Sequence, residues 1–199
     1  MTRLVLFLTA VLALAGCASP NKPLAPAQAA VADYKYLIGP GDSVNIIVWR
    51  NPELSMSVPV RPDGKLTSPL IEDLVAFGKN PTDLAREIEK KLTKFIQDPV
   101  VTVIVTNFVG PFSEQIRIVG SATRPSALPY RQNMTVLDAM IAVGGITEFA
   151  SGNRAVLIRT ADSGKQYTLR LRDLLRRGDV SANADLRPGD VIIIPEGFF

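Results

Sequence analysis

Histidine is absent from all 199 residues of the chain, and cysteine occurs once, as Cys17. Without histidine, the chain cannot form a Ser-His-Asp triad, a histidine-ligated metal site or a histidine pH switch. One cysteine cannot form an internal disulfide or a multi-cysteine metal cluster. A strong charge of one sign is also missing, because the net charge is only +3 and basic residues are scattered among acidic ones. We therefore expect no nucleic-acid partner.

The signatures of common enzyme classes are missing as well. The sequence has no phosphate-binding loop and no dinucleotide-binding glycine motif after a strand. Paired carboxylates could serve a glycosidase, but nearly every candidate aspartate lies beside glycine or proline or at a helix start, where turns and caps account for it. These candidates are Asp42, Asp63, Asp98, Asp138, Asp173 and Asp190. We expect no enzymatic activity, no catalytic residue, no metal and no cofactor.

The N-terminus has the pattern of a bacterial export signal. Residues 1–16 contain one basic residue, Arg3, followed by an apolar run from Leu4 to Leu14 that is short for a permanent membrane span. The run leads into "LAGC" at residues 14–17, which resembles the lipobox of bacterial lipoproteins. We interpret residues 1–16 as a lipoprotein signal peptide and Cys17 as the lipid attachment site.

Acylation at Cys17 would anchor the protein, because several acyl chains contribute about 0.8 kcal/mol for each buried CH₂ group. The alternative is an ordinary secretory signal with an incidental cysteine. Residues 17–33 are rich in alanine and proline, which predicts a flexible acylated tether. Ala18 follows the cysteine in place of the aspartate that favours inner-membrane retention, which points to the outer membrane.

A first domain is expected over residues 34–110. Alternating apolar residues predict a strand after Pro40-Gly41-Asp42, and Asp63-Gly64 predicts a hairpin turn between the strands near Val58 and Leu66. Asn80 and Pro81 have the residue types of a helix N-cap and first helical position. The inner face of this helix is expected to carry Leu84, Ile88, Leu92 and Phe95.

A second domain is expected over residues 111–199. Its predicted helix starts at a Thr135/Asp138 cap and ends at Gly144-Gly145, with Leu137, Met140 and Ile141 facing inward. Five predicted strands with this helix across them fit a β-grasp. The final strand follows a second Pro-Gly-Asp at residues 188–190, and we expect both Pro-Gly-Asp sequences to form type II turns. The fold class is therefore α+β, with two small domains that each combine sheet and helix.

Three side chains are candidates for contact with a glycan or a partner. Trp49 is the only tryptophan, and it could stack on a sugar or anchor a core or an interface. Residues two positions apart on a strand share a face, so we expect Arg170 and Arg172 to project together from the strands of the second domain. Such a basic face could bind an acidic glycan or a partner, and the alternative is an ordinary solvated sheet face.

An ordered set of segments resembles a known family. "YLIGPGDSVNIIVW", "VRPDGKLTSPLI", "PTDLAREIEKKLTKFI" and "DPVVTVIV" resemble the N-terminal domain of the bacterial polysaccharide biosynthesis/export family. "IRIVGSATRPSALPYRQNMTVLDAMIAVGGIT", "NRAVLIR" and "LRPGDVIIIP" resemble the soluble ligand-binding β-grasp domain that accompanies it. The chain departs from the common pattern at Glu72 and Ser126, where the family usually has glycine.

The resemblance implies a lipid-anchored protein on the periplasmic side of the outer membrane that exports capsule or exopolysaccharide. Family members assemble as rings around a polymer passage and receive polymer from an inner-membrane co-polymerase. After "PEGFF" this sequence shows no further β-grasp domain and no amphipathic pore helix, so we expect a collar completed by a separate outer-membrane β-barrel. The alternative is a monomeric periplasmic lipoprotein that binds glycan without forming a passage.

Overall fold

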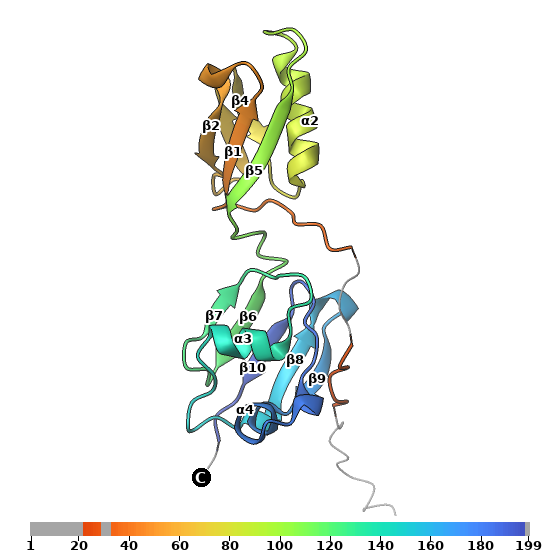
Figure 1. Cartoon of the computed structure of the whole chain (residues 1–199). Helices are drawn as coiled ribbons and strands as arrows, with labels where there is room; N and C mark the ends of the chain where they lie inside the picture. Colours follow the sequence, from red (N-terminus) through yellow and green to blue (C-terminus); the bar gives the residue numbers. More distant parts are fainter. Residues whose placement is uncertain (1–21, 29–32, 198–199) are drawn as a thin grey trace, which may run out of the picture.

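A computed structural model describes residues 22–28 and 33–197. The chain folds into two domains joined by the segment between Asn107 and Ile116 (Figure 1). The buried apolar residues form two separate clusters, one in each domain. Each domain therefore has its own hydrophobic core, as expected of units that fold around independent cores. The predicted α+β class with two domains is confirmed.

The first domain places two small sheets beside one long helix (Figure 1). A three-stranded antiparallel sheet has the order β2-β1-β5, and β3 and β4 form a two-stranded sheet. Its elements are β1 (Ser43–Val48), the 3₁₀ turn η1 (Pro52–Leu54), β2 (Met56–Pro59), β3 (Lys65–Ser68), β4 (Ile71–Val75), α2 (Pro81–Leu92) and β5 (Val101–Asn107).

Helix α2 begins where the sequence predicts. The Asn80 side chain accepts a hydrogen bond from the Asp83 N–H at 2.9 Å, and Pro81 occupies the first helical position. The helix buries Leu84, Ile88 and Leu92 in the core of the first domain. Phe95 lies beyond the end of the helix and is 56% exposed, so its predicted place in the core is wrong.

The turn at Asp63-Gly64 is present, but its strands pair differently from the prediction. Arg61 donates its N–H to the carbonyl of Lys65, and Gly64 donates its N–H to the carbonyl of Arg61. The ladder partner of β3 is β4, and β2 pairs with β1. The sequence pattern did not indicate β4, because its exposed residues interrupt the alternation of apolar side chains.

The second domain is a five-stranded mixed sheet with the order β7-β6-β10-β8-β9, crossed by α3 (Figure 1). Strand β10 runs parallel to β6 and antiparallel to β8. Its elements are β6 (Ile116–Gly120), β7 (Ser126–Leu128), α3 (Val136–Ala142), η2 (Gly152–Arg154), β8 (Ala155–Arg159), η3 (Thr160–Asp162), β9 (Lys165–Leu169), α4 (Leu171–Arg177), η4 (Val180–Ala182) and β10 (Val191–Ile194).

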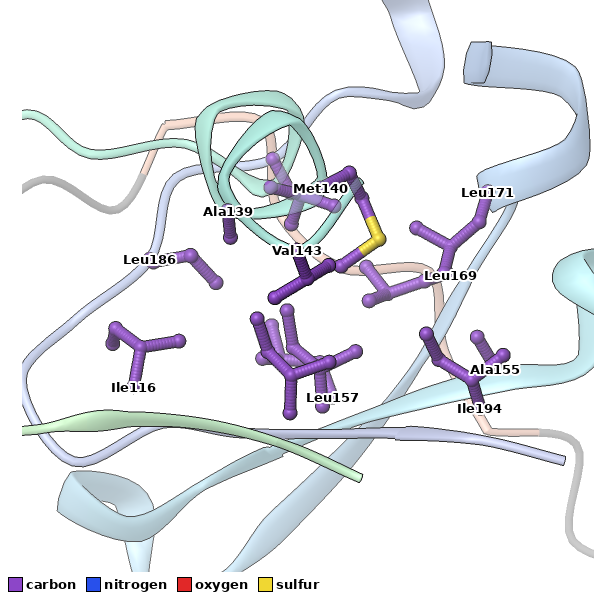
Figure 2. Packing of buried hydrophobic residues seen from close by; sticks show 14 of the residues in the cluster. Ile116, Ala139, Met140, Val143, Ala155, Leu157, Leu169, Leu171, Leu186 and Ile194 are labelled. Atoms are coloured by element: carbon purple, nitrogen blue, oxygen red, sulfur yellow. The ribbon is translucent and has the colours of Figure 1, made fainter. Parts of the chain in front are cut away.

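The core of the second domain lies between α3 and this sheet. Figure 2 shows Met140 and Val143 above Leu157, with Leu169 and Leu171 beside them. Leu157 is fully buried, and replacing a buried leucine by alanine costs about 2–5 kcal/mol, because a cavity is left behind. Packing of the helix onto the sheet therefore contributes strongly to the stability of this domain.

The ends of α3 match the sequence prediction. Thr135 and Asp138 form a reciprocal capping box, and Gly144 and Gly145 have φ values of +78° and +82°, which end the helix. The inward face is partly different from the prediction. Met140 is fully buried, but Ile141 is 69% exposed.

Residues 23–25, which precede the first domain, pair with the edge of the sheet in the second domain. The N–H of Thr168 donates to the carbonyl of Pro23 at 2.8 Å, and the N–H of Ala25 donates to the carbonyl of Thr168 at 3.2 Å. Leu24 thereby forms a parallel bridge beside the edge strand β9. This part of the predicted tether is therefore bonded to the domain, and the pairing covers an otherwise open sheet edge.

Candidate functional site

The junction of the two domains is organised around the buried carboxylate of Asp42. Its Oδ1 accepts hydrogen bonds from the N–H groups of Val109 at 2.7 Å and Gly110 at 2.8 Å. Its Oδ2 accepts from the N–H of Gly39 at 2.9 Å and from the hydroxyl of Tyr36 at 2.6 Å. One side chain before β1 thus holds the start of the interdomain linker.

Two tyrosines before β1 extend this junction. Tyr34 donates its hydroxyl to Glu114 in the linker and packs edge-on against Tyr130 of the second domain, with ring centroids 4.9 Å apart. Tyr36 packs edge-on against Phe108 at 5.3 Å. Burial, followed by the hydrogen bond to Asp42, raises the pKa of Tyr36 above its usual value. Burial and the Glu114 bond raise the pKa of Tyr34 in the same way.

A groove of about 540 Å³ lies between the domains at this junction. We call it the interdomain groove. The first domain contributes residues from before β1 and from the end of β5, and the second contributes the loop after β7. The groove is lined by Tyr36, Thr106, Asn107, Phe108, Pro129, Tyr130, Arg131 and Gln132. A second hollow of about 350 Å³ shares Pro129, Arg131 and Gln132 with it and continues toward α3.

The lining combines aromatic surface with planar hydrogen-bonding groups. Phe108 is 55% exposed, and Asn107, Arg131 and Gln132 are also exposed. Amide and guanidinium groups can bond to neighbouring hydroxyls, and an aromatic ring provides an apolar surface beside them. Such a mixture is typical of small-ligand sites, which combine apolar walls with a few polar groups. The groove can therefore accept a neutral or acidic, hydroxyl-rich ligand.

The aspartates of the two Pro-Gly-Asp sequences form the predicted turns. Gly41 and Gly189 have φ values of +89° and +80°. Asp190 accepts a hydrogen bond from the N–H of Arg187 at 2.9 Å, as Asp42 does from Gly39. Both aspartates are fully buried, and their carboxylates bond to structural donors. Burial raises the pKa of Asp190, opposed by the Arg187 N–H and by the buried Arg159 at 3.5 Å.

Trp49 lies on the surface of the first domain, directly after β1. It is 65% exposed, and its backbone N–H donates to the carbonyl of Val100 at 2.9 Å. The exposure excludes the alternative that Trp49 anchors the core of this domain. Its ring belongs to a different domain from Arg170 and Arg172, so the predicted candidates do not form a single site.

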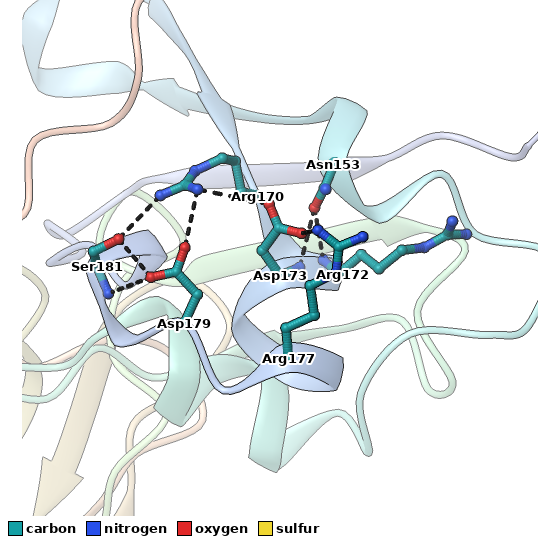
Figure 3. Close-up of polar contacts among 7 residues, drawn as sticks. All are labelled: Asn153, Arg170, Arg172, Asp173, Arg177, Asp179 and Ser181. Carbon is teal, nitrogen blue, oxygen red and sulfur yellow. Dashed lines mark hydrogen bonds and ion pairs between the residues drawn. The ribbon is translucent and has the colours of Figure 1, made fainter.

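Arg170 and Arg172 do not share a strand face, because β9 ends at Leu169 and α4 begins at Leu171. Figure 3 shows the Arg170 side chain in a network of hydrogen bonds and ion pairs with residues of the same domain. It contacts Asp179 at 3.0 Å, Ser181 at 3.2 Å and Asp173 at 3.6 Å. Hydrogen bonds from Ser181, together with Arg170, lower the pKa of Asp179. Arg170 therefore holds the segment after α4 in place through Asp179 and Ser181.

Arg172 points away from that network (Figure 3). Its backbone N–H donates to Asn153 at 3.0 Å, and its side chain is exposed apart from a 3.3 Å bond to the carbonyl of Ala150. Of the two arginines predicted as contacts, Arg172 alone remains open to a ligand. Cys17, the predicted lipid attachment site, lies outside the described residues.

Sequence reasoning missed the interdomain groove, because its lining comes from three segments far apart in the chain. The local signal was limited to aromatic residues within three positions of a proline or a glycine, a pattern that is also typical of a linker. Within residues 22–28 and 33–197, no cluster of three or more acidic or metal-ligating side chains could hold a metal ion. In the same part of the chain, none of the helices combines the length and apolar character needed to cross a membrane.

Two family models match consecutive parts of the chain. Residues 30–106 match the model described as polysaccharide biosynthesis/export protein, and residues 114–194 match the SLBB domain. The chain is 26% identical to the EPS I polysaccharide export outer membrane protein EpsA of Ralstonia nicotianae, over 88% of this chain and 51% of the relative. It is 28% identical to the exopolysaccharide production protein ExoF of Rhizobium meliloti, over 98% of this chain and 47% of the relative. The chain thus spans about half the length of these relatives.

Proposed function

Because the chain belongs to the polysaccharide biosynthesis/export family, we propose that it is a lipid-anchored component of exopolysaccharide or capsule export at the periplasmic face of the outer membrane. The observation that carries the proposal is the pair of consecutive matches, one to each domain, in a chain whose relatives are named export proteins. The lipobox at residues 14–17 supports the lipid anchor at Cys17.

In this proposal several copies assemble into a ring or collar around the polymer. Exposed apolar residues on the outer face of the β2-β1-β5 sheet support self-association. Ile47 and Ile104 lie on that face and are 39% and 46% exposed, and Val100 and Trp49 are 54% and 65% exposed beside it. A patch of this kind on a folded domain commonly marks a protein interface. The inner-membrane co-polymerase would supply the polymer, and a separate outer-membrane β-barrel would complete the passage.

The interdomain groove is the proposed contact for the passing glycan. Its exposed Phe108 ring can lie against the apolar face of a sugar, while Asn107, Arg131 and Gln132 bond to hydroxyls. Contacts of this kind should be weak and repeated, because a polymer that binds tightly would not move through the passage. In this proposal the groove guides the moving glycan and does not hold it tightly.

A second candidate function is a monomeric lipoprotein that binds glycan without forming a passage. The exposed Trp49 and Arg172 favour it, because each could contact a sugar without a second copy of the chain. Under this alternative the apolar patch on the first domain would contact a different protein or the glycan itself.

Native mass spectrometry of the acylated full-length protein in detergent tests the proposal. We expect an oligomer from the unmodified chain and a monomer from Ile104→Lys, because a charge on the apolar face would oppose its burial in an interface. Val119→Lys is the matched control, since Val119 is 44% exposed on β6 in the other domain. Only monomer at every concentration, alone and with membrane extract, would favour the monomeric alternative.

A further inference from the structure

Two adjoining pockets lie on the second domain, between α4, the loop before η2 and the C-terminal residues. Their volumes are about 380 and 440 Å³, and both are lined by Glu148, Ala150 and Arg172. Arg176 and Arg177 line the first pocket, and Arg154 lines the second. We call this surface the arginine pockets. They involve none of the residues that line the interdomain groove.

The backbone around the arginine pockets is held in place by hydrogen bonds. Asn153 Oδ1 accepts from the N–H groups of Arg172 at 3.0 Å and Asp173 at 3.2 Å, which fixes the first turn of α4. The N–H of Gly197 donates to the carbonyl of Phe149 at 2.7 Å, and Ser151 bonds to Pro195 at 2.8 Å. The opposite wall is therefore tied to the end of the sheet.

Hydrogen bonds position the guanidinium groups of Arg154 and Arg172 but use only some of their N–H donors. Arg172 uses one nitrogen on the carbonyl of Ala150 at 3.3 Å. Arg154 donates Nε to Ser151 Oγ at 2.6 Å and Nη2 to the carbonyl of Glu196 at 3.5 Å. A guanidinium carries five N–H donors, so each of these arginines keeps several for a ligand. Arg176 has no ion pair within the part of the chain that the structure describes, and its side chain is exposed.

The charges around the arginine pockets are predominantly positive. Four arginines face two carboxylates, Glu148 and Asp173. Asp173 is already shared between Arg177 at 3.1 Å and Arg170 at 3.6 Å. An anionic ligand can therefore enter beside Arg172 and Arg176 without displacing an internal ion pair of either residue. Planar guanidinium groups match carboxylates particularly well, because they can donate two parallel hydrogen bonds.

We infer that the arginine pockets bind carboxylate groups on an acidic polysaccharide, such as uronic-acid units. The inference rests on the proposed function and specifies a second glycan contact in the same protein. Two hollows that share Arg172 suit neighbouring sugar units of one chain. A glycan fits this site better than an anionic membrane surface, because the arginines line two hollows that single sugar units can enter. Glu148, which lines both pockets, can accept hydrogen bonds from sugar hydroxyls, which lipid phosphates lack.

Calorimetric titration of the full-length protein with trigalacturonate, and separately with a neutral galactose trisaccharide, tests this inference. We expect the acidic sugar to bind at least about tenfold more tightly and Arg172→Ala to remove this preference, because one charge-assisted hydrogen bond is worth about 1.5–3 kcal/mol. Arg117→Ala is the matched control, since Arg117 is an exposed arginine on β6, and its affinity should change less than about twofold. The preference of Arg172→Lys for the acidic sugar should lie between those of the unmodified protein and Arg172→Ala. Lysine keeps the positive charge but cannot donate two parallel hydrogen bonds.

Equal affinity for the two sugars would overturn the inference, as would an acidic preference that Arg172→Ala leaves intact while the variant melts like the unmodified protein. Tighter binding to vesicles of phosphatidylglycerol and phosphatidylcholine than to trigalacturonate would also overturn it, in favour of a membrane contact. These outcomes leave the proposed function standing if loss of the protein still blocks export. Normal export without the protein would instead contradict the proposed function, whatever the sugar preference.

Discussion

Asp42 Oδ1 accepts the N–H of Gly110 at 2.8 Å, although 68 residues separate them in the chain. This bond and its neighbour to Val109 join the turn before β1 to the linker that leads into the second domain. The buried carboxylate of Asp42 therefore fixes the start of the linker, which forms part of the wall of the interdomain groove.

Replacing Asp42 by alanine should strongly destabilise the first domain and its junction. Four donors would lose their acceptor, and buried polar groups without partners cost about 1–3 kcal/mol each, although the costs are not additive. We expect a loss of more than about 3 kcal/mol in urea unfolding. Asp138→Ala is the control, because loss of an exposed helix-capping side chain lowers the free energy of unfolding by about 1 kcal/mol. Equal losses in the two variants would contradict the role given to Asp42.

Tyr36 should make stability sensitive to alkaline pH. Its pKa is raised in the folded state, so the folded protein keeps a phenol proton that the unfolded chain releases near pH 10. This contribution is fully present below about pH 10 and is lost as the pH rises above it. Urea unfolding from pH 8 to 11 should show a shallower loss of stability in Tyr36→Phe. Tyr34→Phe should act in the same direction. An unchanged slope in both variants would contradict this account.

Gly39 should tolerate alanine less well than Gly145 does. A Cβ on Gly39 would lie 2.2 Å from the carbonyl carbon of Gly110, so the linker would have to move. Gly145 has a positive φ, but a Cβ there meets no atom within 4 Å. We expect Gly145→Ala to cost about 1–2 kcal/mol and Gly39→Ala to cost more, with faster proteolysis in the linker. The opposite order in thermal unfolding would show that the close contact is not needed.

The interdomain groove should contact glycan through Phe108. Phe108→Ala should weaken binding of a neutral oligosaccharide by about tenfold, because an aromatic contact is worth about 0.5–1.5 kcal/mol beyond the area it buries. Phe112→Ala is a matched control, since Phe112 is 74% exposed in the same linker but does not line the groove. Chemical-shift titrations of both variants would measure the difference. Equal weakening by the two substitutions would exclude a specific role for Phe108.

Cys17 should determine whether the protein stays at the membrane. Cys17→Ser removes the only thiol, so acyl labelling should disappear and the protein should move to the soluble periplasmic fraction. Labelled palmitate and cell fractionation measure the two effects. Retention at the membrane without acyl label would show that another contact anchors the chain.

Features encoded by neighbouring residues were predictable from the sequence. The Asn80 cap, the Thr135/Asp138 capping box and the positive φ at Gly41 each depend on a few adjacent residues with known conformational preferences. Features set by tertiary packing were not. Ile141 fits a helical pattern but faces outward, and Arg170 is bound by residues up to eleven positions away.

The candidate site was less predictable than the fold for the same physical reason. Tyr36, Phe108 and Arg131 come together only when two separate domains are joined. Arg172 was identified as a contact from an incorrect strand assignment, and it is open because a helix begins there and Asn153 holds its backbone. Sequence patterns indicated which residue types were available for binding. They did not indicate which of these side chains would bond to other residues of the chain and which would stay exposed.

Export is the central claim, and its most direct measurement is the amount of extracellular polysaccharide made by a strain that lacks this chain. We expect extracellular polymer to fall sharply on deletion and to return with the unmodified chain. Undiminished extracellular polysaccharide in the deletion strain, with no second copy of the gene expressed, would contradict the account.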